Sequence, residues 1–290
     1  MQVIFNKYCL YFYGLGLLLL AACEPASVPY FEADNTFAWC IVPFDSEERS
    51  PEERLDMLQN LGITSYAYDW REKHLDEMAN EIQLATDRGI EIIGVWLWID
   101  GNNDTLGQLG AANERVLQIL EKSGLKTSIW MSFHENYFAG LEPVEALAKG
   151  IEMVKYIGTR AQKVGGKVGL YNHGAWFGEP ENQIAILKAL PEYSIGLIYN
   201  FHHAHEQLEV YPDLVKEMTP YLWAVNLNGM KVGGPKILPL GKGDLEQGMI
   251  QLLKNEGYEG PWGILGHVET ADVKLILEEN LTGLQTMELE

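Results

Sequence analysis

The chain has 290 residues, of which 47% are hydrophobic and 11% aromatic, enough apolar material for a large buried core. It carries 41 acidic against 21 basic residues, a formal net charge of -20, and it contains no run of lysine or arginine. This charge excludes nucleic acid as an expected partner and slows the approach of phosphorylated substrates, whereas a neutral ligand feels no such penalty.

The N-terminus reads as an export signal, separate from the fold. One lysine and an apolar stretch lead to Leu-Ala-Ala immediately before Cys23, which resembles a bacterial lipobox. A transmembrane anchor is the weaker alternative, because the apolar run from Leu10 is shorter than the ~20 residues that span a bilayer. We expect a lipoprotein signal peptide over 1–22, lipidation of Cys23 and a tether over 23–36. The protein would then be exported and face the periplasm, with the lipid as its membrane attachment.

Short β-rich apolar runs alternate with amphipathic stretches from residue 37 onward. Eight such runs begin at Phe37, Thr64, Glu91, Lys126, Lys167, Ile195, Tyr221 and Trp262. Their spacing leaves room for a strand, a crossover helix and two loops, and no proline- or serine-rich linker follows residue 36. The pattern predicts a single-domain (β/α)8 TIM barrel over 37–290, with an open doubly wound sheet as the alternative.

Helix boundaries are marked by local sequence signals. Ser50, Pro51 and Glu53 form a capping box with proline at the first helical position. Glycines that can adopt left-handed backbone conformations end four helices just ahead of a strand, at Gly62, Gly89, Gly124 and Gly257.

Polar residues gather where the predicted strands end, which is the catalytic face of such a barrel. Six of the seven histidines are among them. Neutral imidazoles and carboxylates are the usual ligands of divalent transition metals. In strand order the candidates are Asp45; Asp69, Trp70 and Arg71; Trp96, Trp98 and Asp100; His134, Glu135 and Asn136; Tyr171, Asn172, His173 and Trp176; Asn200, His202, His203 and His205; Asn226 and Asn228; His267 and Glu269.

Tryptophans near these strand ends have two interpretations. Trp96 and Trp98 share one face of their strand, because side chains alternate along a strand. A planar apolar wall beside polar groups suits a sugar ring, and a barrel interior needs bulky side chains equally. Both interpretations stay open for Trp96 and Trp176.

Several motifs resemble one known superfamily. They are "LYNHGAWF" from Leu170, "NFHHAH" from Asn200, "LPLGKGD" from Leu238 and the closing "ENLTGL" from Glu279. From about Phe37 to Leu284 the chain resembles the sugar phosphate isomerase and epimerase superfamily, the xylose-isomerase-like barrels that also include endonuclease IV. The resemblance implies the TIM barrel strongly and the activity loosely.

Members of that superfamily commonly hold one divalent metal, and this sequence departs from their ligand pattern. The sixth-strand histidine matches at His203, but the other ligand positions read Asn200, Asn226, Tyr171 or His173, and Gly266 or His267. Amides in place of carboxylates leave less negative charge for a dication, so the usual cage is not implied.

Three hypotheses remain open. In the first, a rearranged site of His173, His203 and one or more of Glu135, His134 and His267 holds Mn, Zn or Co, with Asn200 as a weak oxygen ligand. In the second, a histidine or carboxylate removes a proton from the carbon next to a carbonyl while amides polarise the oxygen, without a metal. In the third, the barrel has lost catalysis and only binds carbohydrate.

We favour an enzyme, because a binding module does not require six histidines at one mouth. The expected reaction is proton abstraction next to the carbonyl of an unphosphorylated keto sugar or glycoside, leading to isomerisation, epimerisation or β-elimination of a 3-keto-glycoside. Predicted catalytic residues are Glu135, His173, His203 and Glu179, and predicted metal ligands are His173, His203, Glu135 and His267. Predicted substrate contacts are Trp96, Tyr171, Asn172, Trp176, Asn200, Asn226 and Asn228. Lys231, Lys236 and Lys242 are interpreted as solvated loop charges.

Overall fold

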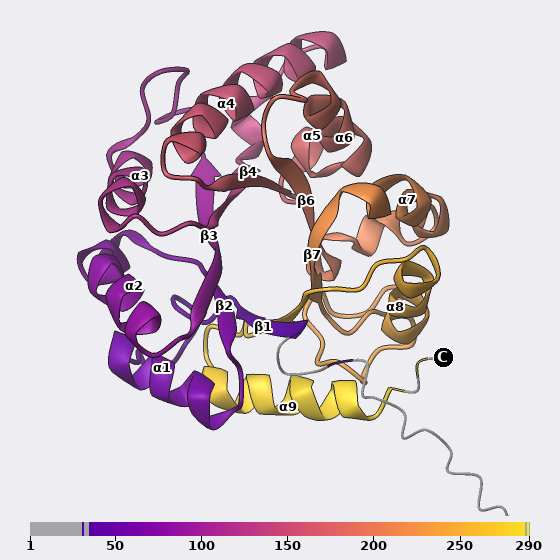
Figure 1. Ribbon diagram of the computed structural model, residues 1–290. Coiled ribbons are helices and arrows are strands. Elements are labelled where there is room, and N and C mark those ends of the chain that lie inside the picture. The colour runs from indigo at the N-terminus through magenta and orange to yellow at the C-terminus, as the bar shows by residue number, and fades with distance from the viewer. Residues whose placement is uncertain (1–30, 32–34, 288, 290) are drawn as a thin grey trace, which may run out of the picture. The chain divides into compact units, whose positions relative to one another are not determined.

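The computed structural model describes residues 31, 35–287 and 289. Eight parallel strands close into a barrel in the order β1-β2-β3-β4-β5-β6-β7-β8, and β8 pairs with β1 from Thr36↔Trp262 to Trp39↔Leu265. Figure 1 looks along the barrel axis and shows the strands as an inner ring with the helices around it. The predicted TIM barrel is therefore confirmed. The predicted signal peptide over 1–22 and Cys23 lie outside the described residues.

All eight predicted strands are present. They are β1 (Thr36–Trp39), β2 (Ser65–Tyr68), β3 (Glu91–Ile99), β4 (Ser128–Phe133), β5 (Lys167–Tyr171), β6 (Ile195–Asn200), β7 (Leu222–Leu227) and β8 (Trp262–Leu265). The first is shorter than its apolar run, because Cys40 adopts a φ of 57° and ends it. Two residues of the predicted tether contact the barrel: Phe31 packs edge-on against Trp262, and Asn35 donates a hydrogen bond to the carbonyl of Glu259.

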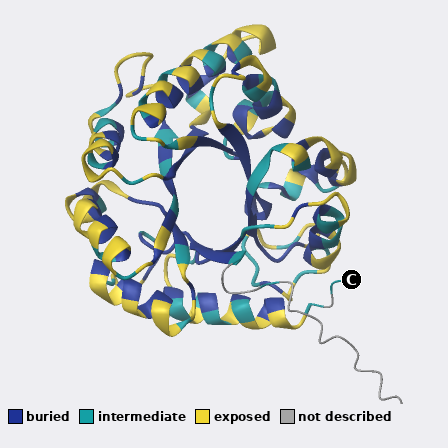
Figure 2. Cartoon of the chain, viewed as in Figure 1, coloured by how far each residue is buried: buried dark blue, intermediate teal, exposed yellow. Residues whose placement is uncertain are grey.

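The helices lie between successive strands. They are α1 (Pro51–Asn60), α2 (Met78–Asp87), α3 (Ala111–Ser123), α4 (Pro143–Lys163), α5 (Ala175–Gly178), α6 (Pro180–Ala189), α7 (Tyr211–Met218), α8 (Glu246–Asn255) and α9 (Val273–Gln285). Short 3₁₀ turns are η2 (Glu72–Asp76), η3 (Glu135–Tyr137), η4 (Phe201–His203), η5 (His205–Gln207) and η6 (Thr219–Tyr221). Figure 2 shows buried strands and helices that bury one stripe each. Among the described residues, no helix has the length and apolar character needed to cross a bilayer.

The predicted helix signals are also confirmed. Ser50 caps α1, its side chain accepts from the Glu53 amide, and the Glu53 carboxylate accepts from the Ser50 amide at 2.9 Å. The four predicted glycine stops all have positive φ, 72°, 68°, 68° and 90° in chain order. Local turn chemistry therefore sets these boundaries.

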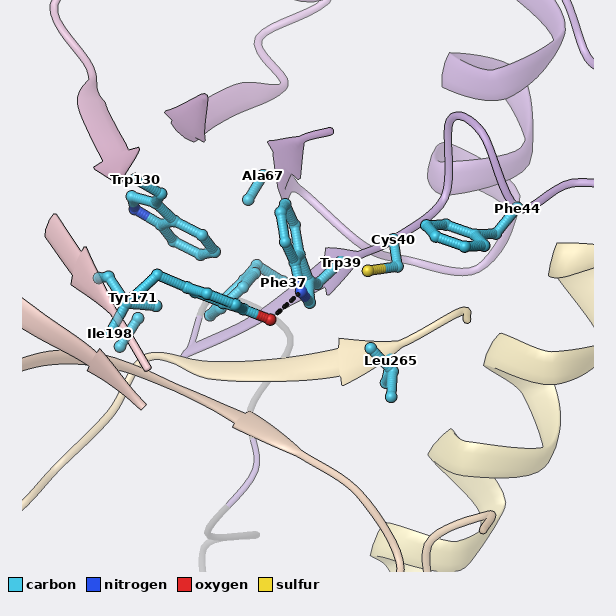
Figure 3. Packing of buried hydrophobic residues seen from close by; sticks show 10 residues of the cluster. Phe37, Trp39, Cys40, Phe44, Ala67, Trp130, Tyr171, Ile198 and Leu265 are labelled. Carbon is cyan, nitrogen blue, oxygen red and sulfur yellow. Dashed lines mark hydrogen bonds between the residues drawn. The ribbon is translucent and has the colours of Figure 1, made fainter. Parts of the chain in front are cut away.

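Aromatic side chains fill the barrel interior and face glycines on neighbouring strands. A Cβ at Gly94 would lie 2.4 Å from the Trp130 ring, and one at Gly263 would lie 2.7 Å from the Phe37 ring. Figure 3 shows this cluster, in which the Trp39 indole nitrogen donates to the Tyr171 hydroxyl at 3.0 Å. Because the interior is a packed core, a ligand is confined to the loops above the strand ends.

Candidate active site

A cavity of about 1250 Å³ opens at the carboxyl ends of β3 to β7. Five residues predicted as catalytic or substrate-binding line it: Glu135, Asn172, His173, Glu179 and His203. Four further strand-end candidates line it as well: Trp98, His134, His202 and His205. A groove of similar volume, about 1210 Å³, lies on the outer surface between α2 and α3, and no histidine lines it. The cavity at the strand ends is therefore the candidate active site.

Four imidazoles from three different strand ends form a continuous row at the mouth. The ring centroids of His173 and His203 lie 4.3 Å apart, those of His203 and His202 4.6 Å, and those of His202 and His267 5.2 Å. The Trp98 ring extends the row, 4.8 Å from His173 and 5.8 Å from His134. Residues separated by more than a hundred positions in the chain thus meet at one site.

These imidazoles are neutral at neutral pH. Burial, followed by the charges of Lys236, His134 and His267, lowers the pKa of His173 to about 4. Burial, followed by the charge of His267, lowers the pKa of His202 to about 3, although its hydrogen bond to the Lys236 carbonyl opposes the shift. Burial, then His173 and His202, holds the pKa of His203 well below its ordinary value. Each neutral ring keeps one nitrogen that can accept a proton or a hydrogen bond.

Hydrogen bonds to one carbonyl set the tautomers of two rings. His202 Nδ1 lies 3.2 Å and His205 Nε2 lies 3.0 Å from the carbonyl oxygen of Lys236. A carbonyl can only accept, so both nitrogens carry the proton. His202 Nε2 is then the accepting nitrogen of its ring. The buried Nδ1 of His173 has no hydrogen-bond partner within the described part of the chain.

Glu179 is held by two polar side chains from the sixth strand and the loop after it. The buried Tyr199 hydroxyl donates to Gln207 Oε1 at 2.8 Å, and Gln207 Nε2 donates to Glu179 Oε2 at 2.9 Å. Glu179 also occupies the N-cap position of α6, before Pro180, without a capping hydrogen bond from its side chain. The Glu179 carboxylate is therefore oriented at the cavity wall, and its second oxygen takes no part in these two hydrogen bonds. Sequence reasoning missed Gln207, because a single glutamine in a loop carries no pattern.

Three residues predicted to bind substrate make hydrogen bonds within the fold, and of these three only Asn172 also lines the cavity. The Tyr171 hydroxyl accepts from Trp39 Nε1 at 3.0 Å and from Asn200 Nδ2 at 2.5 Å. Asn200 Oδ1 accepts from the His202 amide at 2.9 Å, which caps η4. Asn172 accepts from the Asn200 amide and donates to its carbonyl, at 2.7 and 3.2 Å. These side chains fix the ends of β5 and β6, and thereby the histidines that follow.

The two predicted tryptophan walls also lie elsewhere. Trp96 packs on the barrel interior and donates its indole N–H to Ser132 at 2.8 Å. Trp176 packs against Phe138, with ring centroids 4.9 Å apart, and does not line the cavity. Trp98, a candidate from the strand-end survey, lines the cavity in their place.

The other two predicted asparagines, Asn226 and Asn228, do not line the cavity. Asn228 donates to the carbonyl of Lys236 at 3.1 Å and accepts from the Leu238 amide at 3.3 Å, so it holds the loop after β7. Asn226 is fully buried, and neither amide atom has a partner among the described residues. Neither side chain is therefore placed to contact sugar hydroxyls in the cavity.

The described residues do not fit a divalent-metal cage. They include no group of three or more His, Cys, Asp or Glu side chains that could hold a metal ion. Glu135 is exposed at the start of η3, and His267 packs against Phe44 with ring centroids 3.8 Å apart. Both amide atoms of Asn200 are already engaged, which removes it as an oxygen ligand.

No family model and no curated protein matches this sequence. Solved structures do match its fold. A D-psicose 3-epimerase shares 15% identity at a TM-score of 0.62, over 86% of this chain and 96% of that one. The 3-keto-D-glucoside 4-epimerase YcjR from E. coli shares 13% identity at a TM-score of 0.64, over 87% and 99%. An L-ribulose 3-epimerase shares 12% identity at a TM-score of 0.60, over 87% and 95%.

These likenesses show the fold, which is the xylose-isomerase-like TIM barrel. These three structures are sugar epimerases, and the resemblance read from the motifs is confirmed at the level of fold. At such low identity they carry no residue roles over to this chain.

Proposed function

We propose that this chain is a sugar isomerase- or epimerase-like enzyme that removes a proton next to the carbonyl of an unphosphorylated keto sugar or glycoside. One observation carries the proposal: a row of neutral imidazoles and an oriented carboxylate line one cavity at the strand ends. Proton abstraction needs a positioned base, and sugar recognition needs polar groups in fixed positions.

Glu179 is the base that the geometry favours, because Gln207 and Tyr199 hold it at the cavity wall. Glu135, His173 and His203 also line the cavity and are the alternative bases. The base takes the proton, the C–H electron pair forms a C=C bond, and the carbonyl π pair moves onto oxygen. Return of the proton to the other face of that carbon gives an epimer. Its return to the former carbonyl carbon gives an isomer, provided that the hydroxyl on the neighbouring carbon passes its proton to the former carbonyl oxygen and becomes the new carbonyl.

The charge of the cavity supports a neutral substrate. Four glutamates and two lysines line it, and the whole chain carries a net charge of -20. A phosphorylated sugar would meet repulsion both on approach and at this wall. The half-buried Trp98 ring beside His173 supplies a planar surface on which a sugar ring can stack.

Elimination from a 3-keto-glycoside is a second candidate, favoured by the likeness of fold to the 3-keto-D-glucoside 4-epimerase. It shares the first step: the same proton is removed, and the enolate then expels the substituent at the β carbon with its bonding electrons. The expelled oxygen takes up a proton to leave as an alcohol.

Solvent deuterium uptake into a panel of ketoses and 3-keto-glucosides tests the proposal. We expect exchange with at least one sugar, and a loss of about 100-fold or more in Glu179→Gln, the range for general base catalysis. Glu217→Gln, an exposed glutamate on α7, is the matched control and should keep full activity. Binding of a sugar without exchange or product would make the chain a carbohydrate-binding protein and reject the enzyme.

We also propose that Cys23 is lipidated and anchors the exported chain to a bacterial membrane. The lipobox-like Leu-Ala-Ala-Cys sequence supports this. Cys23→Ser should release the protein from the membrane fraction into the soluble fraction, and membrane association that stays unchanged would contradict the anchor.

A further inference from the structure

The loop between β7 and α8 is long, lacks regular structure and is nevertheless tied down by buried side chains. The Glu246 carboxylate accepts from the amides of Met230, Gly241 and Gly243, at 3.0, 3.1 and 2.9 Å. Asn280 on α9 accepts from the Leu240 amide at 2.8 Å. Long ordered loops of this kind commonly serve function.

The backbone of Lys236 is held against the histidine row at the end of β6. Its carbonyl accepts from His202 Nδ1, His205 Nε2 and Asn228 Nδ2, at 3.2, 3.0 and 3.1 Å. Three hydrogen-bond donors on this one carbonyl fix the position of the Lys236 backbone, from which the side chain extends. Lys236 itself lines the cavity.

The Lys236 ammonium has no ion pair within the described ranges, whereas Lys231, also in this loop, pairs with Asp244 at 3.2 Å. The positive charge of Lys236 reaches the imidazoles at the barrel mouth. It is one of the causes that lower the pKa values of His173, His202, His203 and His267. Neutral imidazoles do not neutralise it. Lys236 is an exposed residue that lines the cavity, so an ammonium group without an ion pair among the described residues lies at the rim of the site of the proposed chemistry.

Proton removal next to a carbonyl places a negative charge on the carbonyl oxygen, and that oxygen needs a positive partner. The side chains of the described residues do not form a metal cage that would supply one. We propose that Lys236 is this partner, donating hydrogen bonds from its ammonium group to the oxygen as it becomes an enediolate. The ammonium keeps its own protons, and the abstracted proton stays on the base. The inference rests on the proposed function and revises the interpretation of Lys236 as a solvated charge.

Deuterium exchange of purified full-length Lys236→Met, in the presence of EDTA, tests this role. We expect the rate at saturating sugar to fall by about 100-fold or more, the usual effect of removing an oxyanion donor, with a smaller change in KM. Lys236→Arg should recover part of the rate. Lys242→Met is the matched control, because it removes the same charge from the same loop at a residue outside the cavity. It should leave the rate unchanged.

An unchanged rate in Lys236→Met would overturn the inference while leaving the proposed function intact. Wild-type exchange that EDTA abolishes, with stoichiometric metal in the untreated protein, would also overturn it. If wild type exchanges no sugar, the proposed function fails. The role of Lys236 is then tested separately by calorimetry with oxalate, a planar dianion that resembles an enediolate. Oxalate binding that Lys236→Met loses and Lys242→Met keeps would support Lys236 as the cation of the cavity, and equal binding in both would overturn it.

Discussion

Polar residues at the strand ends differ sharply between the two sides of the barrel mouth. On the side of β8, β1 and β2, Asp45 is bound by Arg49 at 2.7 Å, and Arg49 also reaches Asp272 at 2.8 Å. On the side of β5 and β6, the imidazoles of His173 and His203 contact each other and have lowered pKa values. The carboxylates of Asp45 and Asp272 are thus taken up by an ion pair, whereas the imidazoles of His173 and His203 line the cavity.

The first side is also where a buried ion pair ties two helices together. Arg54 on α1 pairs with Glu81 on α2, and the Tyr66 hydroxyl donates to the same carboxylate at 2.9 Å. Both charged side chains are almost completely buried. This ion pair therefore serves stability, whereas the imidazoles of His173 and His203 lie at the cavity.

The largest effect on stability should come from Arg54→Met. It leaves the Glu81 carboxylate buried without its cation, which lowers the free energy of unfolding by about 3–5 kcal/mol. Denaturant unfolding measures it. Arg88→Met removes an arginine whose partner Asp56 is largely exposed, and should change stability by about 1 kcal/mol or less. Equal effects of the two substitutions would contradict the assignment of the buried pair to stability.

Asp69→Asn should remove a pH dependence of stability. Burial raises the pKa of Asp69 to about 7, above its unfolded value, so the folded state holds a proton that the unfolded state has lost. Wild type should therefore lose stability as pH rises from about 4 through 7, by roughly 3 kcal/mol. Unfolding curves at pH 5 and pH 8 measure the change. If the difference in the free energy of unfolding between wild type and Asp69→Asn stays constant with pH, the raised pKa is contradicted.

Tyr171→Phe tests the support beneath the histidines. It leaves the buried donors of Trp39 and Asn200 without their shared acceptor, so stability should fall by about 2 kcal/mol. Because Asn200 caps the turn that carries His202 and His203, the exchange rate should fall as well. Tyr193→Phe, whose hydroxyl lies in an exposed pair with Thr159, is the control. Lower activity without lower stability would instead make Tyr171 a substrate ligand.

The smallest effect at neutral pH should come from His173→Gln. The imidazole Nδ1 has no partner among the described residues, so stability at pH 7 should change by about 1 kcal/mol or less. The lowered pKa of about 4 means that wild type loses stability as pH falls below the unfolded value near 6.5. Between pH 7 and pH 4.5 the free energy of unfolding of the variant should therefore fall by roughly 2 kcal/mol less than that of wild type. Parallel stability curves would show that the imidazole is not buried as a neutral group.

Much of the fold could be predicted from the sequence, because its signals are local. Apolar periodicity located all eight strands, and turn chemistry located the cap at Ser50 and the glycine stops. The gathering of histidines followed as well, since parallel strands in a barrel place all their carboxyl ends on one face.

Only the tertiary structure decided which strand-end residues face the cavity. Trp96 and Trp98 share a strand face, but the register pairs Trp96 with Trp130 in the packed interior and Trp98 with Ser132 above it. Asn200 and Tyr171 satisfy each other across β5 and β6, whereas Lys236 stays unpaired within the described chain. Height along the barrel and hydrogen bonds between distant segments exist only once the ring has closed, so no local pattern in the chain encodes them.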